Sequence, residues 1–384
     1  MDGCRKQINI MDITSNEHIA HEGFIRRASE LDMPFMLKGS YISRQYFPEG
    51  VARYPADLDW VYLHYLEDPV LASAKFDEWM IAVTELELND GVKFQSFRED
   101  QFWRMMDYSM ADDFPTVNTD IVCQVDGEAV RLNIDISFNL DVEQPPIPLR
   151  YKPFRGDSFD IPYTVPLSLQ VSWKIHQTLV RPRFKDLFDL SYLVKNPAFT
   201  AETLQHTMQA LVNECAVDHV DLERLKHFLS YNFEELFPAD SIEPNWRRWR
   251  HRSNEYGYIR AAYWDEIAFH LTDADTLPNN LDDFLQQVSE SLRQAGIDME
   301  LWPNLPEADR IVRKGYRDLS NSYLFDNSDL RPYSERDQPV VDPATYRSNV
   351  PETLHNTLST ERNPSPAKGD RRYGFFNFIR NWFS

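Results

Sequence analysis

Two aspartates separated by a single residue, Asp57 and Asp59, form the pair best suited to chemistry in this sequence. They lead into an apolar run, Trp60–Leu63, which predicts a β-strand. Side chains alternate between the two faces of a strand, so both carboxylates point the same way while Leu58 points into the core. Carboxylate oxygens are hard ligands for divalent cations. The spacing therefore predicts a site for Mg²⁺, with Mn²⁺ as an alternative ion.

A glycine–serine step, Gly39–Ser40, ends a short apolar run upstream of the two aspartates. Glycine has no Cβ, so the backbone N–H groups of such a turn can approach a phosphate closely. A phosphate-binding turn beside paired carboxylates is the minimum arrangement for metal-assisted nucleotidyl transfer. We therefore expect a nucleoside triphosphate to be the substrate.

These two features resemble the Gly-(Gly/Ser)…Asp-x-Asp signature of the polymerase-beta-like nucleotidyltransferases. Leu37–Ser40 together with Arg53–Asp59 most resembles the AbiEii/AbiGii-type toxin nucleotidyltransferases of that superfamily. A second block, Leu167–Val194, resembles the second motif of the same family: a helix lysine, an Arg-rich turn and an Asp-x-x-Asp-Leu helix. The sequence departs from the pattern at Pro55, where the family usually has Ser or Thr.

The resemblance implies roles for the residues of the second block. Those at the matching positions are Lys174, Arg181, Arg183, Asp186 and Asp189. The cations would neutralise the triphosphate and its pyrophosphate leaving group, and the acids would orient the cations or the base. A simpler interpretation is a lysine that snorkels from an amphipathic helix, with surface acids paired to Lys185 or Arg183. We prefer the functional interpretation for Lys174 and Asp186, and Asp189 is left open.

A third carboxylate, Asp135, lies in the clearest hairpin of the sequence. The segments Thr116–Val125 and Glu128–Leu140 flank Asp126–Gly127, a dipeptide typical of a tight turn with positive φ. The second arm alternates strictly, and Asp135 is on its polar face. An exposed face of an antiparallel sheet would explain this pattern. The resemblance implies a third metal-binding carboxylate beside the Asp-x-Asp strand, and we prefer this second interpretation.

Patterns of apolar residues predict the elements that position these side chains. Helical spacing predicts helices over residues 17–31, 41–46, 69–88, 168–180 and 184–194. Alternation predicts a strand over 92–97, while 101–110 is ambiguous between helix and strand. Residues 141–166 are rich in Pro, Asp and aromatic residues and are predicted to be a loop between domains.

The chain is acidic, with 40 Lys and Arg against 61 Asp and Glu and a net charge of −21. Most of its surface should therefore repel nucleic acid. One dense basic and aromatic stretch, Trp246–Arg252, is the local exception. A helix with its tryptophans in the core and its arginines in water accounts for this stretch without any function. It is also the best candidate for contacting an RNA backbone, through Arg247, Arg248, Arg250 and Arg252.

The three cysteines, Cys4, Cys123 and Cys215, are far apart in the sequence, which argues against both a disulfide framework and a zinc site. No apolar run approaches the length of a membrane span or of a signal peptide. These features predict a cytoplasmic protein without a membrane span.

The sequence as a whole predicts an α+β fold of polymerase-beta-like type, with a mixed sheet and helices. We expect a nucleotidyltransferase catalytic domain over residues 1–165, a helical domain completing the nucleotide site over 166–325, and a disordered tail with an aromatic end over 326–384.

The predicted function is metal-dependent transfer of a nucleotide from a nucleoside triphosphate to an acceptor. The resemblance implies a toxin of a toxin–antitoxin or phage-defence system, with tRNA as one candidate acceptor and an antitoxin protein as a candidate partner. The alternatives are a nucleotidyltransferase that modifies a protein or small molecule, and a non-catalytic binding protein on the same fold.

Overall fold

The structure is a computed structural model, and the residues that it describes all lie within the unit Met1–Leu330. The described residues are 16–49, 51, 55, 57–66, 68–106, 115–140, 142–239, 241–255 and 277–308. The predicted tail, residues 326–384, and Cys4 lie outside them.

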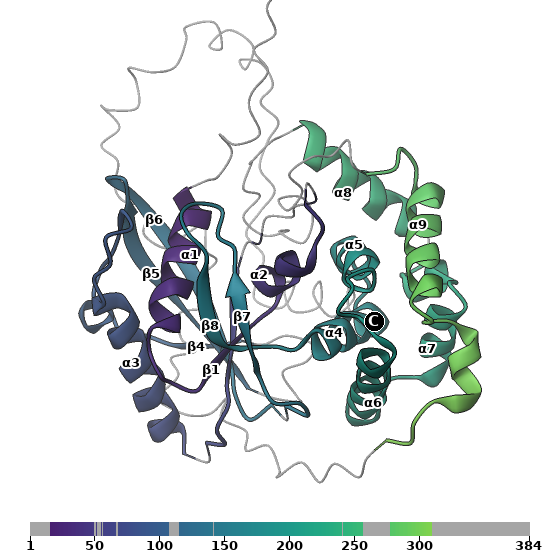
Figure 1. The fold of residues 1–384 in the computed structure, drawn as a ribbon, viewed down its shortest axis with the longest axis horizontal. Helices are drawn as coiled ribbons and strands as arrows, with labels where there is room; N and C mark the ends of the chain where they lie inside the picture. The colour runs from purple at the N-terminus through teal and green to yellow at the C-terminus, as the bar shows by residue number, and fades with distance from the viewer. Residues whose placement is uncertain are drawn as a thin grey trace, which may run out of the picture. The chain divides into compact units, whose positions relative to one another are not determined.

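Eight strands form one mixed sheet in the order β3-β5-β6-β2-β1-β8-β7, with β4 paired to β5. Figure 1 shows this sheet and the helices that follow it along the chain. The pairs β2–β6 and β1–β8 are parallel, and the other pairs are antiparallel. The sheet and the helical region that follows it confirm the predicted α+β class. The strands are β1 (Phe35–Lys38), β2 (Leu58–Tyr62), β3 (Val92–Phe94), β4 (Arg104–Met105), β5 (Thr116–Val125), β6 (Glu128–Ser137), β7 (Ile147–Tyr151) and β8 (Phe159–Thr164).

The hairpin of β5 and β6 forms around the predicted tight turn. Asp126 and Gly127 have φ values of 49° and 91°, in the left-handed region that an Asp-Gly turn favours. The register then continues without a break from Val125↔Glu128 to Thr116↔Ser137. This unbroken register determines which side chains of the two arms lie side by side.

Two parts of the strand prediction were wrong. Residues 141–166 are not a loop, because β7 and β8 pair with each other and β8 also pairs with β1. Pro148 is tolerated because β7 is the last strand of the sheet, where a missing N–H breaks no ladder. The strand predicted over 92–97 ends at Phe94 and a 3₁₀ helix follows it. The ambiguous segment 101–110 contains the short strand β4.

The helices agree with the predicted ones to within a few residues at most ends. Asp68 caps α3 by accepting a hydrogen bond from the N–H of Val70, with Pro at the first turn. The α-helices are α1 (Asn16–Ser29), α2 (Ser40–Ser43), α3 (Pro69–Glu85), α4 (Leu167–Val180), α5 (Phe184–Leu193), α6 (Ala201–Val217), α7 (Leu222–Leu229), α8 (Ile242–Glu255) and α9 (Leu281–Gln294). The 3₁₀ helices are η2 (Arg44–Tyr46), η3 (Phe97–Glu99), η4 (Phe233–Leu236) and η6 (Met299–Asn304).

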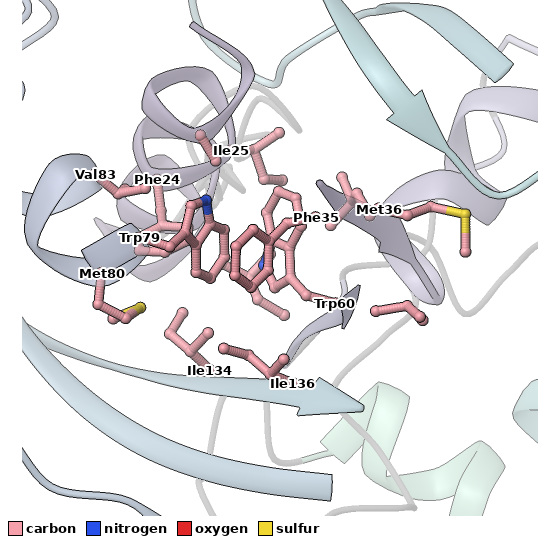
Figure 2. Packing of buried hydrophobic residues seen from close by; sticks show 14 of the residues in the cluster. Phe24, Ile25, Phe35, Met36, Trp60, Trp79, Met80, Val83, Ile134 and Ile136 are labelled. Carbon is pink, nitrogen blue, oxygen red and sulfur yellow. The ribbon is translucent and has the colours of Figure 1, made fainter. Parts of the chain in front are cut away.

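One hydrophobic core lies between the sheet and the helices α1 and α3. At its centre the rings of Phe35 and Trp79 stack with centroids 4.0 Å apart, and Trp60 meets Trp79 edge-on at 5.0 Å (Figure 2). Burying Trp60 on this side of β2 directs its neighbour Asp59 to the opposite face of the sheet. The packing of the core therefore decides which face carries the carboxylates.

A second hydrophobic core forms among α4 to α9 and includes Phe184, Trp246, Trp249 and Phe284. Helix α4 packs against both cores, because its Leu169 belongs to the first core and most of its buried apolar residues to the second. The domain boundary predicted near residue 165 stays a prediction. Within the described parts of the chain, no helix combines the length and the apolar character needed to span a membrane.

Candidate active site

A pocket of about 240 Å³ opens between the sheet and the helices α4 and α5. Every residue predicted from the sequence to take part in metal or nucleotide binding lines it, although their roles remain predictions. The sheet and the β1–α2 turn contribute Lys38, Gly39, Ser40, Asp57, Asp59, Asp135 and Ser137. The helices and the turn between them contribute Gln170, Trp173, Lys174, Gln177, Val180, Arg181, Arg183, Lys185 and Asp186.

On the sheet side, five strands place one polar side chain each in a single cross-strand row. The register pairs Lys38 of β1 with Asp59 of β2, and Asp59 with Asp135 of β6. It continues from Asp135 to Asn118 of β5 and from Asn118 to Arg104 of β4. Directly opposed residues on neighbouring strands have their side chains in contact range. The two carboxylates are therefore neighbours although they are far apart in the sequence.

The pKa of each of these two carboxyl groups is raised. Burial, and then the charges of Asp59 and Asp57, raise the pKa of Asp135 to about 7, against a smaller lowering by its hydrogen bond from Asn118. Burial also raises the pKa of Asp59, and Asp57 adds to the effect, although the ammonium of Lys38, 3.7 Å from Asp59 Oδ1, opposes it. Carboxylates held together in a half-buried site favour a state with added positive charge.

This donor set fits a hard divalent cation, since paired carboxylate oxygens are its preferred ligands. Asp57 precedes β2, lines the same pocket and interacts electrostatically with both other acids. Among the described residues, however, no group of three or more Asp, Glu, His or Cys side chains is arranged so that it could hold a metal ion by itself. Asp59 and Asp135 form a pair, and Asp57 lines the same pocket near them. Such a set suits a cation whose coordination is completed by oxygens of the substrate.

The turn at Gly39 requires glycine for two reasons. Its backbone angles, φ 77° and ψ −150°, lie in a region that only glycine adopts readily. A Cβ at this position would also collide with Asp59 Oδ2. The absence of a side chain thus lets the turn before α2 lie directly against the acidic pair.

Gln170 of α4 fastens this turn to the helical region, and the sequence analysis missed it. Its Nε2 donates to the Gly39 carbonyl (3.1 Å) and to Ser43 Oγ (2.6 Å). Gln170 is only 3% exposed, so these bonds are shielded from water. Its position one helical turn before Lys174 was a signal that both residues face the same side of α4.

On the helical side, Lys174 is held between two buried acids. Its Nζ lies 3.0 Å from Asp186 Oδ1 and 2.7 Å from Asp189 Oδ2. Arg183 adds a second cation to Asp186, with Nε 2.6 Å from Oδ2. The lysine side chain is 9% exposed and the two acids at most 1%, which excludes the interpretation of a snorkelling lysine with surface acids.

The charges on this side compensate one another. Burial alone would raise the pKa of Asp186, but Arg183, Lys174 and Lys185 together outweigh it and hold this pKa well below its usual range. The charges of Lys174 and Arg183 are balanced by those of Asp186 and Asp189. Arg181, which is exposed, and Lys185 add further positive charge to the lining of the pocket. The sequence analysis had considered Lys185 only as a partner of surface acids and had predicted no role for it in binding.

The basic helix α8 lies next to α5. As predicted, Trp246 and Trp249 are buried, each 2% exposed, and the Trp249 ring stacks on Phe184 with centroids 5.8 Å apart. Arg247 is exposed and paired with Glu243, whereas Arg250 donates to the Pro278 carbonyl and to Asn279. The side chains of Arg248 and Arg252 lie outside the described residues.

The family model for the nucleotidyl transferase AbiEii toxin of type IV toxin–antitoxin systems matches residues 24–329. Two solved structures are similar to this chain. JHP933 from Helicobacter pylori is 14% identical, with a TM-score of 0.41, and the match covers 76% of this chain and 96% of that one. The nucleotidyltransferase toxin MenT4 from Mycobacterium tuberculosis H37Rv is 13% identical, with a TM-score of 0.38, and the match covers 75% and 89%. A search of curated proteins found no match. Because the family model spans most of the chain, this protein belongs to the AbiEii nucleotidyltransferase toxin family, as its sequence motifs had indicated.

Proposed function

We propose that this toxin transfers a nucleotide from a nucleoside triphosphate to a hydroxyl-bearing acceptor in a reaction that depends on Mg²⁺ or Mn²⁺. The observation that carries the proposal is the distribution of charge around the pocket. Its sheet side carries Asp57, Asp59 and Asp135 and is here called the sheet wall, and its α4–α5 side carries Lys174, Arg181, Arg183, Lys185 and Asp186 and is called the helical wall. The sheet wall is mainly acidic and the helical wall mainly basic. A nucleoside triphosphate bound to a divalent cation has the matching distribution of charge.

Asp57, Asp59 and Asp135 would hold the metal ion. The raised pKa of Asp59 and of Asp135 supports this role, because a cation relieves the repulsion between them. When bound, the ion would polarise the phosphate oxygens and favour ionisation of the attacking hydroxyl.

The protein's own groups then have separate tasks. The backbone N–H groups of the Gly39–Ser40 turn hold the β- and γ-phosphates. Lys174 and Arg181, joined by Lys185, neutralise the charge of the pyrophosphate as it leaves. Asp186 orients Lys174 and Arg183 through the ion pairs described above.

Asp135 completes the reaction as proton acceptor. The acceptor oxygen attacks the α-phosphorus, the bond from that phosphorus to the β-phosphate bridging oxygen breaks, and the hydroxyl proton passes to Asp135.

The acceptor is tested by incubating the full chain and Mg²⁺ with each labelled nucleoside triphosphate and either total RNA or a protein extract. Label that nuclease removes identifies an RNA acceptor, and label that protease removes identifies a protein acceptor. Asp59→Asn should give no labelling, while Asp160→Asn, an exposed acid on β8, should label like the wild type. Labelling that persists in Asp59→Asn would remove the acidic pair from the reaction.

We favour tRNA among the acceptors, with α8 as its contact and an antitoxin and phage defence as the biological setting. Arg247→Glu should then raise the acceptor KM several-fold at low salt, and high salt should reduce this difference, since exposed charges are screened. Triphosphate KM should not change. Acceptor titrations at two salt concentrations measure this, and identical curves for the variant and wild type would exclude α8 from the site.

A further inference from the structure

A chain of hydrogen-bonded polar side chains extends from the acidic pair across β5 to β4. Asn118 stands opposite Asp135 in the hairpin register, and its Nδ2 donates to Asp135 Oδ1. Its own Oδ1 accepts from Arg104 Nη2 at 2.5 Å. A guanidinium can only donate, so the amide oxygen must face Arg104 and the amide nitrogen must face Asp135. The orientation of Asn118 is therefore unambiguous.

The far end of this chain is anchored by Asp120. Its Oδ2 lies 2.9 Å from Arg104 Nη2, and its Oδ1 accepts from Asn133 Nδ2 at 2.8 Å. Asn133 and Asn118 also bond each other through their amides, at 2.6 and 3.0 Å. Asn118 is 3% exposed and the Asp120 side chain 7%. Water thus competes little for these bonds, and the amide has little freedom to rotate.

We propose that Asn118 is a positioning residue for Asp135, and that Arg104, Asn133 and Asp120 hold Asn118 in place for this task. The terminal torsion of an aspartate is soft, and the like charge of Asp59 beside it pushes the Asp135 carboxylate away. Because the Asn118 amide is held in place and donates to Asp135 Oδ1, it keeps the Asp135 carboxylate in one orientation beside Asp59. Groups that orient a metal ligand in this way tune metal affinity. The inference rests on the proposed function, because it assigns Asp135 to the metal site.

The experiment measures Mn²⁺ binding by calorimetry on the full chain without nucleotide, together with the melting temperature and, in EDTA, the affinity for a nucleoside triphosphate. Asn118→Leu should weaken Mn²⁺ binding about 10- to 100-fold. Triphosphate affinity in EDTA should stay within about twofold, since the helical wall is untouched. Thr119→Val is the matched control on the same strand, because Thr119 is buried and its Oγ1 has no hydrogen-bond partner among the described residues.

Arg104→Met provides a second, milder variant should Asn118→Leu not fold. It removes the outer donor to Asn118 and leaves the amide bond to Asp135, so Mn²⁺ affinity should fall less, by about threefold to tenfold. A purely structural role for Asn118 predicts a lower melting temperature with wild-type Mn²⁺ affinity in the folded protein. Wild-type Mn²⁺ affinity in folded Asn118→Leu, or in Arg104→Met if only that variant folds, overturns the inference.

The failure of the proposed function would be recognised separately. If the wild-type protein binds no Mn²⁺, both with and without nucleotide, the metal-dependent function and the role of Asn118 fail together. If the wild type binds Mn²⁺ and Asp59→Asn does not, the metal site stands, and the Asn118 variants alone decide the inference.

Discussion

The two walls of the pocket handle buried charge in opposite ways. On the sheet, Asp59 and Asp135 are like charges in one row, and the pKa of each is raised. On the helices, Lys174 is enclosed by Asp186 and Asp189, and the pKa of Asp186 is lowered. The buried charges of Lys174, Asp186 and Asp189 balance one another without a ligand, whereas a bound cation would reduce the repulsion between Asp59 and Asp135. In the proposed function, the unbalanced charge of the sheet is therefore where the cation would bind, and the balanced charge of the helices is where the protein is preorganised.

The largest effect should come from neutralising the sheet wall. Asp59→Asn should lower the rate of transfer by at least about 10³-fold, because a metal-binding carboxylate is lost. Its free energy of unfolding should be equal to or higher than that of the wild type, since a like-charge repulsion is removed. Steady-state kinetics and urea denaturation measure the two quantities. Normal turnover in this variant would show that the two walls do not differ in the proposed way.

On the helical wall, the corresponding change should lower stability in addition to activity. Lys174→Met leaves two buried acids with one cation fewer, which should lower the free energy of unfolding by about 3–5 kcal/mol. Lys185→Met is the comparison on the same wall: it should weaken triphosphate binding and lower stability less than Lys174→Met, because Lys185 contributes less than Lys174 to the stabilisation of the Asp186 charge. Urea denaturation of both variants at one pH makes the comparison. Equal stability of the two variants would contradict the idea that Lys174 is held in a balanced cluster.

A smaller effect, with a defined dependence on pH, should follow from Asp135→Asn in EDTA. In the wild type the folded pKa, about 7, is higher than the ordinary value of 3.8, so stability is lost as pH rises between them. The variant lacks this loss and should gain stability relative to the wild type on going from pH 5 to pH 8, by about 1–2 kcal/mol. Denaturation at both pH values measures it. A difference between variant and wild type that does not change with pH would argue against a carboxyl that titrates in this range.

The smallest effect concerns the link between the walls. Gln170→Met removes two hydrogen bonds to the Gly39 turn and should weaken triphosphate binding about tenfold. Ser43→Ala removes one of the same bonds, so the double variant should lose less than the sum of the two single changes. Triphosphate titrations of the four proteins complete this double-mutant cycle. Additive losses would mean that Gln170 does not act through Ser43.

Local sequence patterns predicted much of the fold for a clear reason. The Asp126–Gly127 turn determines the register of the hairpin, and counting back equally from it places Asn118 opposite Asp135, a signal that the sequence analysis did not use. Helices α4 and α5 could be predicted from apolar spacing and from Pro182 between them. Motif resemblance pointed to Asp57, Asp59, Lys174 and Asp186, which all line the pocket, because a motif depends on residue type and order alone.

Contacts between distant segments were decided only by the tertiary structure. The parallel pairing of β2 with β6, which brings Asp59 beside Asp135, joins strands with long intervening segments and leaves no local pattern, so only the family resemblance had implied it. The β7–β8 hairpin was missed because its prolines argue against strands: Pro148 is tolerated on the edge strand β7, and Pro162 of β8 falls at the register shift opposite it. Whether Lys174 faces water or pairs with Asp186 and Asp189 depends on which charged side chains the packing of the helices brings together. The sequence by itself determined which residues could do chemistry, and the packing of sheet against helices decided their neighbours and hence their charge states.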